Sequence, residues 1–200
     1  MFTSGGRGQS AMGPPTAARM AASPGYDGRV TPLAARIVLG HGASGTAASM
    51  KPYVDALAKR GVDGRAVDLP RGRPEAAVEI FLAAAAADPG LALGGHSFGG
   101  RMASLAAGRT HVPALVCFSY PVHRPGQPEL GSRVAHWPAI SCPVLLLSGD
   151  RDPFARIDLL RTAAETLPHG RLVVFPGAVH GLRGHLDAAL EVAADFLLGV

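Results

Sequence analysis

The sequence predicts an α/β protein with a mostly parallel sheet of about six strands and helices on both faces. From about residue 33 onwards, short apolar runs alternate with longer segments in which apolar residues recur at helical spacing. The short runs are apolar at nearly every position, as expected for parallel strands that are covered on both faces. The chain has 200 residues, of which 48% are hydrophobic and 17% charged, so one domain with a substantial core is expected.

Six segments are predicted to be strands. In chain order they are 36–40, 62–68, 90–94, 114–118, 144–147 and 171–175. The second is the least apolar of the six. Short apolar runs of this length, separated by helical segments, are typical of βαβ units.

Five segments between or after these strands show the 3.6-residue spacing of apolar positions that indicates helices. They are 50–58, 74–87, 101–107, 157–167 and 186–197. Gly61 follows the first, and Pro74 stands in the first turn of the second, where proline is tolerated. The stretch 121–140 breaks the alternation. Because it follows a strand, we expect a loop or short helix at the edge of the sheet where ligands bind.

Two parts of the chain differ in composition. Residues 1–30 are rich in Gly, Ala, Pro, Ser and Arg without any period, which predicts a disordered tail or an over-extended start. Residues 31–200 are predicted to form the folded domain. The net charge of +4 comes from scattered arginines. No basic helix face is evident, so nucleic acid is not an expected partner.

No segment has the length of a transmembrane helix or the pattern of a secretory signal, so we expect a cytoplasmic protein without a membrane partner. Cys117 and Cys142 lie in or beside apolar runs. Buried free thiols are expected there, and a disulfide between neighbouring strands is the alternative. Two cysteines cannot form a structural zinc site, and we expect neither a metal nor another cofactor. The sequence does not indicate an oligomeric state.

The run Gly95-His96-Ser97-Phe98-Gly99 is the most informative motif. It is a G-x-S-x-G pattern between a predicted strand and a predicted helix, the context of a nucleophile elbow. A sharp strand-to-helix turn would project the Ser97 hydroxyl above the sheet. Gly95 and Gly99 would remove Cβ atoms where the strand and the helix approach closely.

A serine nucleophile needs a base and an acid that orients the base. In hydrolases with such an elbow, the acid and then the histidine follow the serine along the chain. The strand 144–147 leads into Asp150 and Asp152, both on the elbow's side of the sheet. We assign the acid to Asp152, which stands at the top of the turn before Pro153. Asp150 could instead cap a helix or pair with a neighbour, and both could be helix-entry acids.

The candidate base follows the last predicted strand, 171–175. His180 lies among small residues in that loop, where it can reach Ser97. His185 is the competing histidine, but it falls at the start of the terminal helix, where a solvated side chain is ordinary. Ser97, Asp152 and His180 therefore form the predicted catalytic set.

Backbone N–H groups are expected to stabilise the oxyanion. One is the amide of Phe98, and the second comes from the loop His41–Gly45, where Ala43 is the expected donor. Gly42 and Gly45 let this loop approach a substrate. Packing or hydrogen-bonding roles are expected for four further side chains near the predicted site. These are His41, His96, Arg101 and His123.

Five runs of the sequence resemble a small, cap-free α/β hydrolase of the dienelactone-hydrolase-like group, and more specifically the branch of the testis-expressed hydrolase-like proteins and their bacterial relatives. The runs are 39–45, 93–101, 117–126, 149–154 and 177–181. The resemblance implies that the elbow serine, the aspartate before Pro153 and the last-loop histidine form the triad. It also implies an α/β-hydrolase fold.

These observations predict a serine hydrolase of carboxylic esters or thioesters that acts on a small-molecule acyl substrate through an acyl-enzyme. Two alternatives stay open. The chain could be a non-catalytic protein-interaction adaptor on a hydrolase scaffold, because fold does not imply function. It could also be an acyltransferase, in which an alcohol or amine replaces water.

Overall fold

The structure, a computed structural model, describes Met1 and residues 35–127 and 131–200. The predicted tail over residues 1–30 lies almost entirely outside the described residues, as does the start of the predicted domain. The division at residue 30 therefore stays a prediction.

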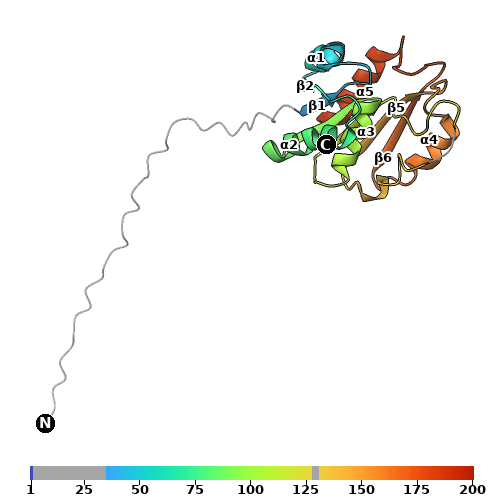
Figure 1. Cartoon of the computed structure of the whole chain (residues 1–200). Helices are drawn as coiled ribbons and strands as arrows, with labels where there is room; N and C mark the ends of the chain where they lie inside the picture. The colour runs from blue at the N-terminus through green and yellow to red at the C-terminus, as the bar shows by residue number, and fades with distance from the viewer. Residues whose placement is uncertain (2–34, 128–130) are drawn as a thin grey trace. The chain divides into compact units, whose positions relative to one another are not determined.

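The six predicted strands are confirmed and form one parallel sheet (Figure 1). Their order across the sheet is β2-β1-β3-β4-β5-β6. The strands are β1 Arg36–Gly40, β2 Asp63–Val67, β3 Leu91–His96, β4 Leu115–Phe118, β5 Val144–Gly149 and β6 Gly170–Phe175. Because all six are parallel, the segments that follow them meet at one edge of the sheet.

In the described part of the chain, five α-helices cover the two faces of the sheet. They are α1 Lys51–Ala58, α2 Pro74–Ala87, α3 Phe98–Ala107, α4 Ile157–Ala164 and α5 Leu186–Leu198. Helices α2, α3 and α4 pack on one face and α1 and α5 on the other, each set with its own hydrophobic core. The prediction of helices on both faces is confirmed. The described residues also include two short 3-10 helices, η1 Ala47–Met50 and η2 Trp137–Ala139.

Alternating side chains of the central strands supply both cores. In β1, Val38 points into the core beneath α2, α3 and α4, whereas Ile37 and Leu39 point into the core beneath α1 and α5. All three are fully buried. A strand covered on both faces needs apolar residues at every position, which explains why these runs lack alternation.

Helix α4 ends at Ala164, three residues earlier than predicted. The chain continues in turns, with the N–H of Leu167 donating to the carbonyl of Ala164 at 3.1 Å. Leu167 is nevertheless buried in the same core as Leu160. The apolar spacing therefore marks residues that reach the core, not only residues that are helical.

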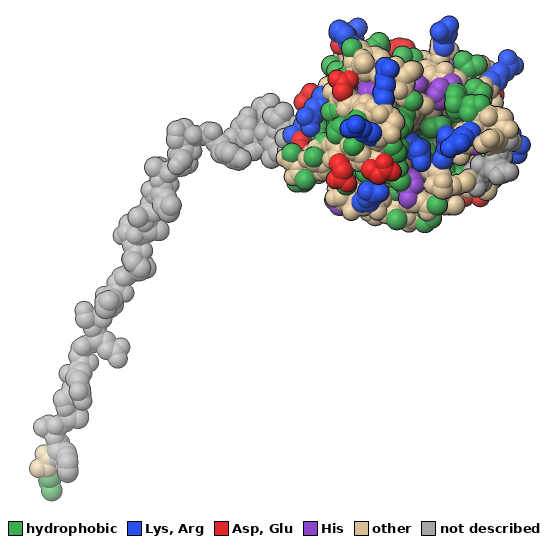
Figure 2. Space-filling model, in the orientation of Figure 1, with side chains coloured by type: hydrophobic (Ala, Val, Ile, Leu, Met, Phe, Trp, Pro, Cys, Tyr) green, Lys and Arg blue, Asp and Glu red, His purple; other side chains and the backbone are tan. Residues whose placement is uncertain are grey.

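The connection between β4 and β5, residues 119–143, is the longest of the connections between successive strands. Its described part contains only η2, so the described residues include no cap domain above the sheet. Cys117 and Cys142 are buried free thiols, as predicted. Among the described residues, no helix combines the length and the apolar character needed to cross a membrane. Figure 2 shows Lys and Arg side chains spread over the visible face rather than in one stripe.

Candidate active site

Ser97 is the single residue between β3 and α3. The strand runs to His96 and the helix begins at Phe98, so the turn is sharper than the predicted boundaries allowed. Ser97 has φ 51° and ψ −110°, a backbone conformation that non-glycine residues rarely adopt. Such strain concentrates at functional sites because the surrounding structure has to enforce it.

Gly95 and Gly99 allow β1, β3 and α3 to approach at this turn. A Cβ atom on Gly99 would overlap the backbone carbonyl of Gly40 on β1. A Cβ atom on Gly95 would lie 2.5 Å from the same carbonyl oxygen and 2.7 Å from the carbonyl carbon of Gly99. Both glycines of the motif are thus required by close backbone contacts, as the sequence predicted.

A chain of hydrogen bonds joins Ser97, His180 and Asp152. The Nε2 atom of His180 lies 2.9 Å from the Oγ atom of Ser97. The Nδ1 atom of His180 lies 2.8 Å and 3.0 Å from the two carboxylate oxygens of Asp152. An ionised carboxylate only accepts hydrogen bonds, so Nδ1 carries the proton and Nε2 is free to accept from the Ser97 hydroxyl.

The surroundings of Asp152 and His180 differ. The Asp152 carboxylate is fully buried, whereas 21% of the His180 side chain is exposed. The N–H of Phe154 also donates to Asp152 Oδ1 at 2.8 Å, and the Phe154 ring packs against the His180 ring at 4.5 Å. The acid is therefore held in place from two sides, and the histidine stays within reach of a ligand from solvent.

The two competing residues lie elsewhere. Asp150 is exposed, and its Oδ1 atom accepts a hydrogen bond from the N–H of Gly177 at 2.7 Å. It neither caps a helix nor pairs with Arg151, which were the alternatives for it. His185 precedes α5, where its ring packs against Phe175 at 5.8 Å.

The loop that carries His180 is fixed at three points. Besides the contact with Asp150, the N–H of Arg151 donates to the carbonyl of Ala178 at 3.0 Å. The third contact is made by Ser119, whose Oγ atom accepts from the N–H of Gly181 at 3.1 Å. Ser119 is fully buried and has φ 52°. Sequence reasoning assigned it no role, although its place directly after a central strand was a signal for one.

The predicted oxyanion loop passes beside the serine. A Cβ atom on Gly42 would lie 3.0 Å from His96 Nδ1 and 4.0 Å from Ser97 Cβ. The backbone N–H groups of Ala43 and Phe98 have no hydrogen-bond acceptor within the part of the chain that the structure describes. Two unpaired amides near a nucleophile can accommodate a developing negative charge.

The His41 side chain holds the 41–45 loop through hydrogen bonds. It is buried, and its Nε2 atom accepts from the N–H of Leu69 at 2.9 Å. Its other nitrogen therefore carries the proton and donates to the carbonyl of Gly42 at 2.7 Å. That carbonyl also accepts from the N–H of Gly45 at 2.9 Å. The hydrogen-bonding role predicted for His41 is confirmed.

His96 packs against the histidine of the candidate site. The ring centroids of His96 and His180 are 5.1 Å apart, and the ring centroid of Tyr53 lies 6.3 Å from that of His96. Burial, followed by the charge of His180, lowers the pKa of His96 to about 4. His96 is therefore neutral at physiological pH and adds no charge next to His180.

The family can be stated once this geometry is known. A family model described as "Alpha/beta hydrolase domain" matches residues 72–190, which is more than half of the chain. The chain belongs to the α/β hydrolase family. The matched residues include Ser97, Asp152 and His180. The predicted fold class is thus confirmed by the parallel sheet and by the family.

Solved structures of a lipase and of other proteins share this fold. A monoacylglycerol lipase from Paleococcus ferrophilus has a TM-score of 0.70 and 17% identity, over 82% of this chain and 94% of the lipase. Est1E from Butyrivibrio proteoclasticus, solved with ferulic acid, has a TM-score of 0.69 and 18% identity, over 82% and 88%. Esterase 2 from Thermogutta terrifontis, phosphorylated by paraoxon, has a TM-score of 0.65 and 23% identity, over 82% of this chain and 82% of the esterase. None of the curated protein sequences compared with the chain matches it.

Proposed function

We propose that this α/β hydrolase cleaves carboxylic esters or thioesters, with Ser97 as the nucleophile, His180 as the base and Asp152 as the acid that orients it. The proposal rests above all on the continuous hydrogen bonds from Ser97 through His180 to Asp152. The resemblance of the five sequence runs 39–45, 93–101, 117–126, 149–154 and 177–181 supports placing the chain in the dienelactone-hydrolase-like group. The buried thiols of Cys117 and Cys142 are compatible with a cytoplasmic location.

The first half of the reaction forms an acyl-enzyme. The Ser97 Oγ atom bonds to the acyl carbon while its proton moves to His180 Nε2, and the carbonyl electron pair moves onto the oxygen. The amides of Ala43 and Phe98 stabilise that oxyanion. The oxyanion then collapses and the bond to the alcohol or thiol breaks. His180 returns the proton to the leaving group.

The second half releases the acyl group. Water loses a proton to His180 Nε2 and attacks the acyl carbon, and the bond to Ser97 breaks as the proton returns to Oγ. Asp152 stabilises the imidazolium in both halves without taking its proton. The described residues include no cap domain, and the 119–143 connection is the segment that could cover the site, so we propose an open pocket for a small or extended acyl group.

Steady-state kinetics with p-nitrophenyl esters and a matching thioester test this function. We expect turnover by the full chain, and a loss of kcat by about 10,000-fold or more in Ser97→Ala. The matched control is Ser141→Ala, because Ser141 is exposed and lies before β5 at the opposite edge of the sheet. A folded protein that turns over no ester contradicts the proposal. Transfer of the acyl group to an added alcohol, without free acid, would indicate an acyltransferase.

A further inference from the structure

Three arginines in or beside the 119–143 connection have no carboxylate partner among the described residues. Arg101 lies one turn into α3, and Arg124 and Arg133 belong to the connection itself. Across the described residues, none of the three forms an ion pair. Arg156, which is close by in the fold, is paired with Asp158 at 2.7 Å. We call Arg101, Arg124 and Arg133 the arginine cluster.

The members of the arginine cluster are close enough to affect one another. Burial and the charges of Arg101 and Arg124 lower the pKa of Arg133. The Nε atom of Arg101 is buried and has no hydrogen-bond partner in the described part of the chain. Arginine is rarely buried without a partner, because removing its charge from water is costly. The cluster therefore carries positive charge that the described residues do not balance.

Arg133 is held in a fixed position. Its Nη1 atom donates to the carbonyl of His123 at 2.9 Å and to that of Pro121 at 3.2 Å. Its own carbonyl accepts from the hydroxyl of Tyr120 at 2.6 Å. Carbonyl oxygens orient the guanidinium but do not neutralise it. Its remaining N–H groups are thus presented in a geometry set before any ligand arrives.

A cavity of about 180 Å³ lies against these side chains. Arg124, Arg133, His123 and Ser132 are among the residues that line it. Water occupies about 30 Å³ per molecule in the liquid, so this volume suits a carboxylate or phosphate group with a short piece of chain. The lining offers guanidinium and hydroxyl donors, which bind oxyanions.

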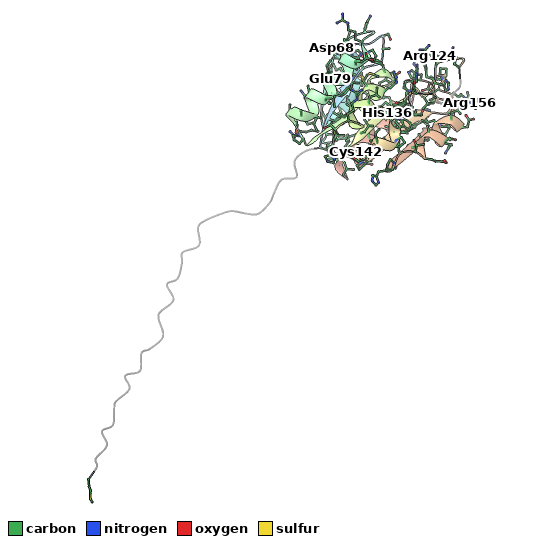
Figure 3. All side chains as sticks on the ribbon, turned by 60° about the horizontal axis from the view of Figure 1, so that its bottom comes forward. Asp68, Glu79, Arg124, His136, Cys142 and Arg156 are labelled. Carbon is green, nitrogen blue, oxygen red and sulfur yellow. The ribbon has the colours of Figure 1, made fainter. Side chains whose placement is uncertain are left out.

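Arg124 of the arginine cluster lies on the same side of the molecule as the paired Arg156 (Figure 3). The labelled acids Asp68 and Glu79 lie on the other side of that view. Neither of these two acids is therefore beside Arg124.

The cavity is connected to the candidate active site through a few contacts. The N–H of His123 donates to the carbonyl of Phe154 at 3.2 Å, and the Phe154 ring packs against His180. The cavity is therefore two residue contacts away from His180, through His123 and then Phe154.

We propose that the arginine cluster binds a carboxylate or phosphate group at the far end of the acyl chain, so that the preferred substrates are esters of acids with a terminal anion. Arg124 and Arg133 would contact the anion, and the charge of Arg101 would support them from α3. This inference rests on the proposed ester hydrolysis, because it names the substrate class of the same site.

Paired substrates test the preference. The p-nitrophenyl monoester of adipic acid and the p-nitrophenyl ester of 6-phosphonooxyhexanoic acid are compared with neutral p-nitrophenyl hexanoate. We expect kcat/KM to be about 10- to 100-fold higher for at least one anionic ester, and which one identifies the anion. Arg133→Gln and Arg124→Gln should remove most of the preference, because kcat/KM falls much more for the anionic esters than for the neutral ester. Arg133→Lys should restore part of it.

Arg156→Gln is the matched control, since it removes the same charge from a guanidinium that is already paired. It should keep the preference of the wild type. Hydrolysis of the neutral ester with no preference for either anion would overturn the inference and leave the proposed function intact. Equal losses for neutral and anionic esters in Arg133→Gln would also overturn it, because they indicate a structural role.

A binding measurement separates the inference from the proposed function. Calorimetry on the full chain carrying Ser97→Ala measures binding of monomethyl adipate and of inorganic phosphate. We expect binding of at least one of them, weakened about 10-fold or more by Arg133→Gln. If no ester is hydrolysed but this binding is found, the anion site stands and the proposed function is wrong. Absence of binding overturns the anion site.

Discussion

The candidate triad and the arginine cluster differ in how completely the chain satisfies their polar groups. His180 has a partner on each ring nitrogen, and Asp152 accepts from both His180 and the backbone of Phe154. Arg101, Arg124 and Arg133 have no acidic partner in the described part of the chain. Groups that react are pre-organised by the chain, whereas groups that recognise a charge can be completed by the ligand itself.

The largest expected effect concerns the acid of the triad. Asp152→Asn should lower kcat for a p-nitrophenyl ester by about 10,000-fold, because an amide favours the wrong tautomer of His180. Asp150→Asn is the matched control, and we expect a loss of less than about 10-fold, since Asp150 only anchors the turn at Gly177. Thermal melts of both variants check the fold. A larger loss in the Asp150 variant would contradict the assignment.

The next effect is on stability at the elbow. Gly99→Ala should lower the free energy of unfolding by about 3 kcal/mol or more, because the new Cβ atom would overlap the carbonyl of Gly40. Denaturant unfolding measures this change. Gly131→Ala is the control, since a Cβ atom there meets no atom within 4 Å. Equal stability of the two variants would show that β1 and α3 can separate at little cost.

The candidate triad and the arginine cluster illustrate what the sequence could and could not predict. Ser97, Asp152 and His180 each follow a parallel strand, and the carboxyl ends of parallel strands lie at one edge of a sheet. Strand order along the chain was therefore sufficient to bring them together. Two features could not be predicted in this way. The role of Ser119 depends on its positive φ, and the arginine cluster depends on the path of the long connection.

A smaller effect is expected at Ser119. Ser119→Ala removes the acceptor for the N–H of Gly181 and loosens the loop that carries His180. We expect kcat to fall about 10-fold with little change in KM, because positioning of the base is affected more than binding. The exposed Ser141→Ala variant should behave as the wild type. Unchanged kcat in Ser119→Ala would mean that the other two anchors suffice.

The smallest effect is on the pH dependence of stability and concerns His136, which lies near Arg101 of the arginine cluster. Burial and then the charges of Arg101 and Arg109 lower the pKa of His136 to about 4. As the pH falls, the unfolded chain binds this proton first, near pH 6.5, so the folded state loses stability between about pH 6.5 and about pH 4.

His136→Gln should remove this contribution. When the pH is lowered from 7 to 4.5, we expect the melting temperature of the wild type to fall by about 3 °C more than that of the variant. This difference corresponds to about 1 kcal/mol in the free energy of unfolding. His111→Gln, at an exposed position, should keep the pH dependence of the wild type. A parallel course of the His136→Gln and wild-type melting curves would contradict the lowered pKa of His136 in the folded protein.

The most direct test of the proposed function is covalent labelling of the nucleophile. The full chain is treated with paraoxon or a fluorophosphonate, and its intact mass and the modified peptide are measured. We expect one adduct, on Ser97, in the wild type and none in Ser97→Ala, with much slower labelling in Asp152→Asn. A folded wild-type protein that gains no adduct, or gains it on another residue, would contradict the account.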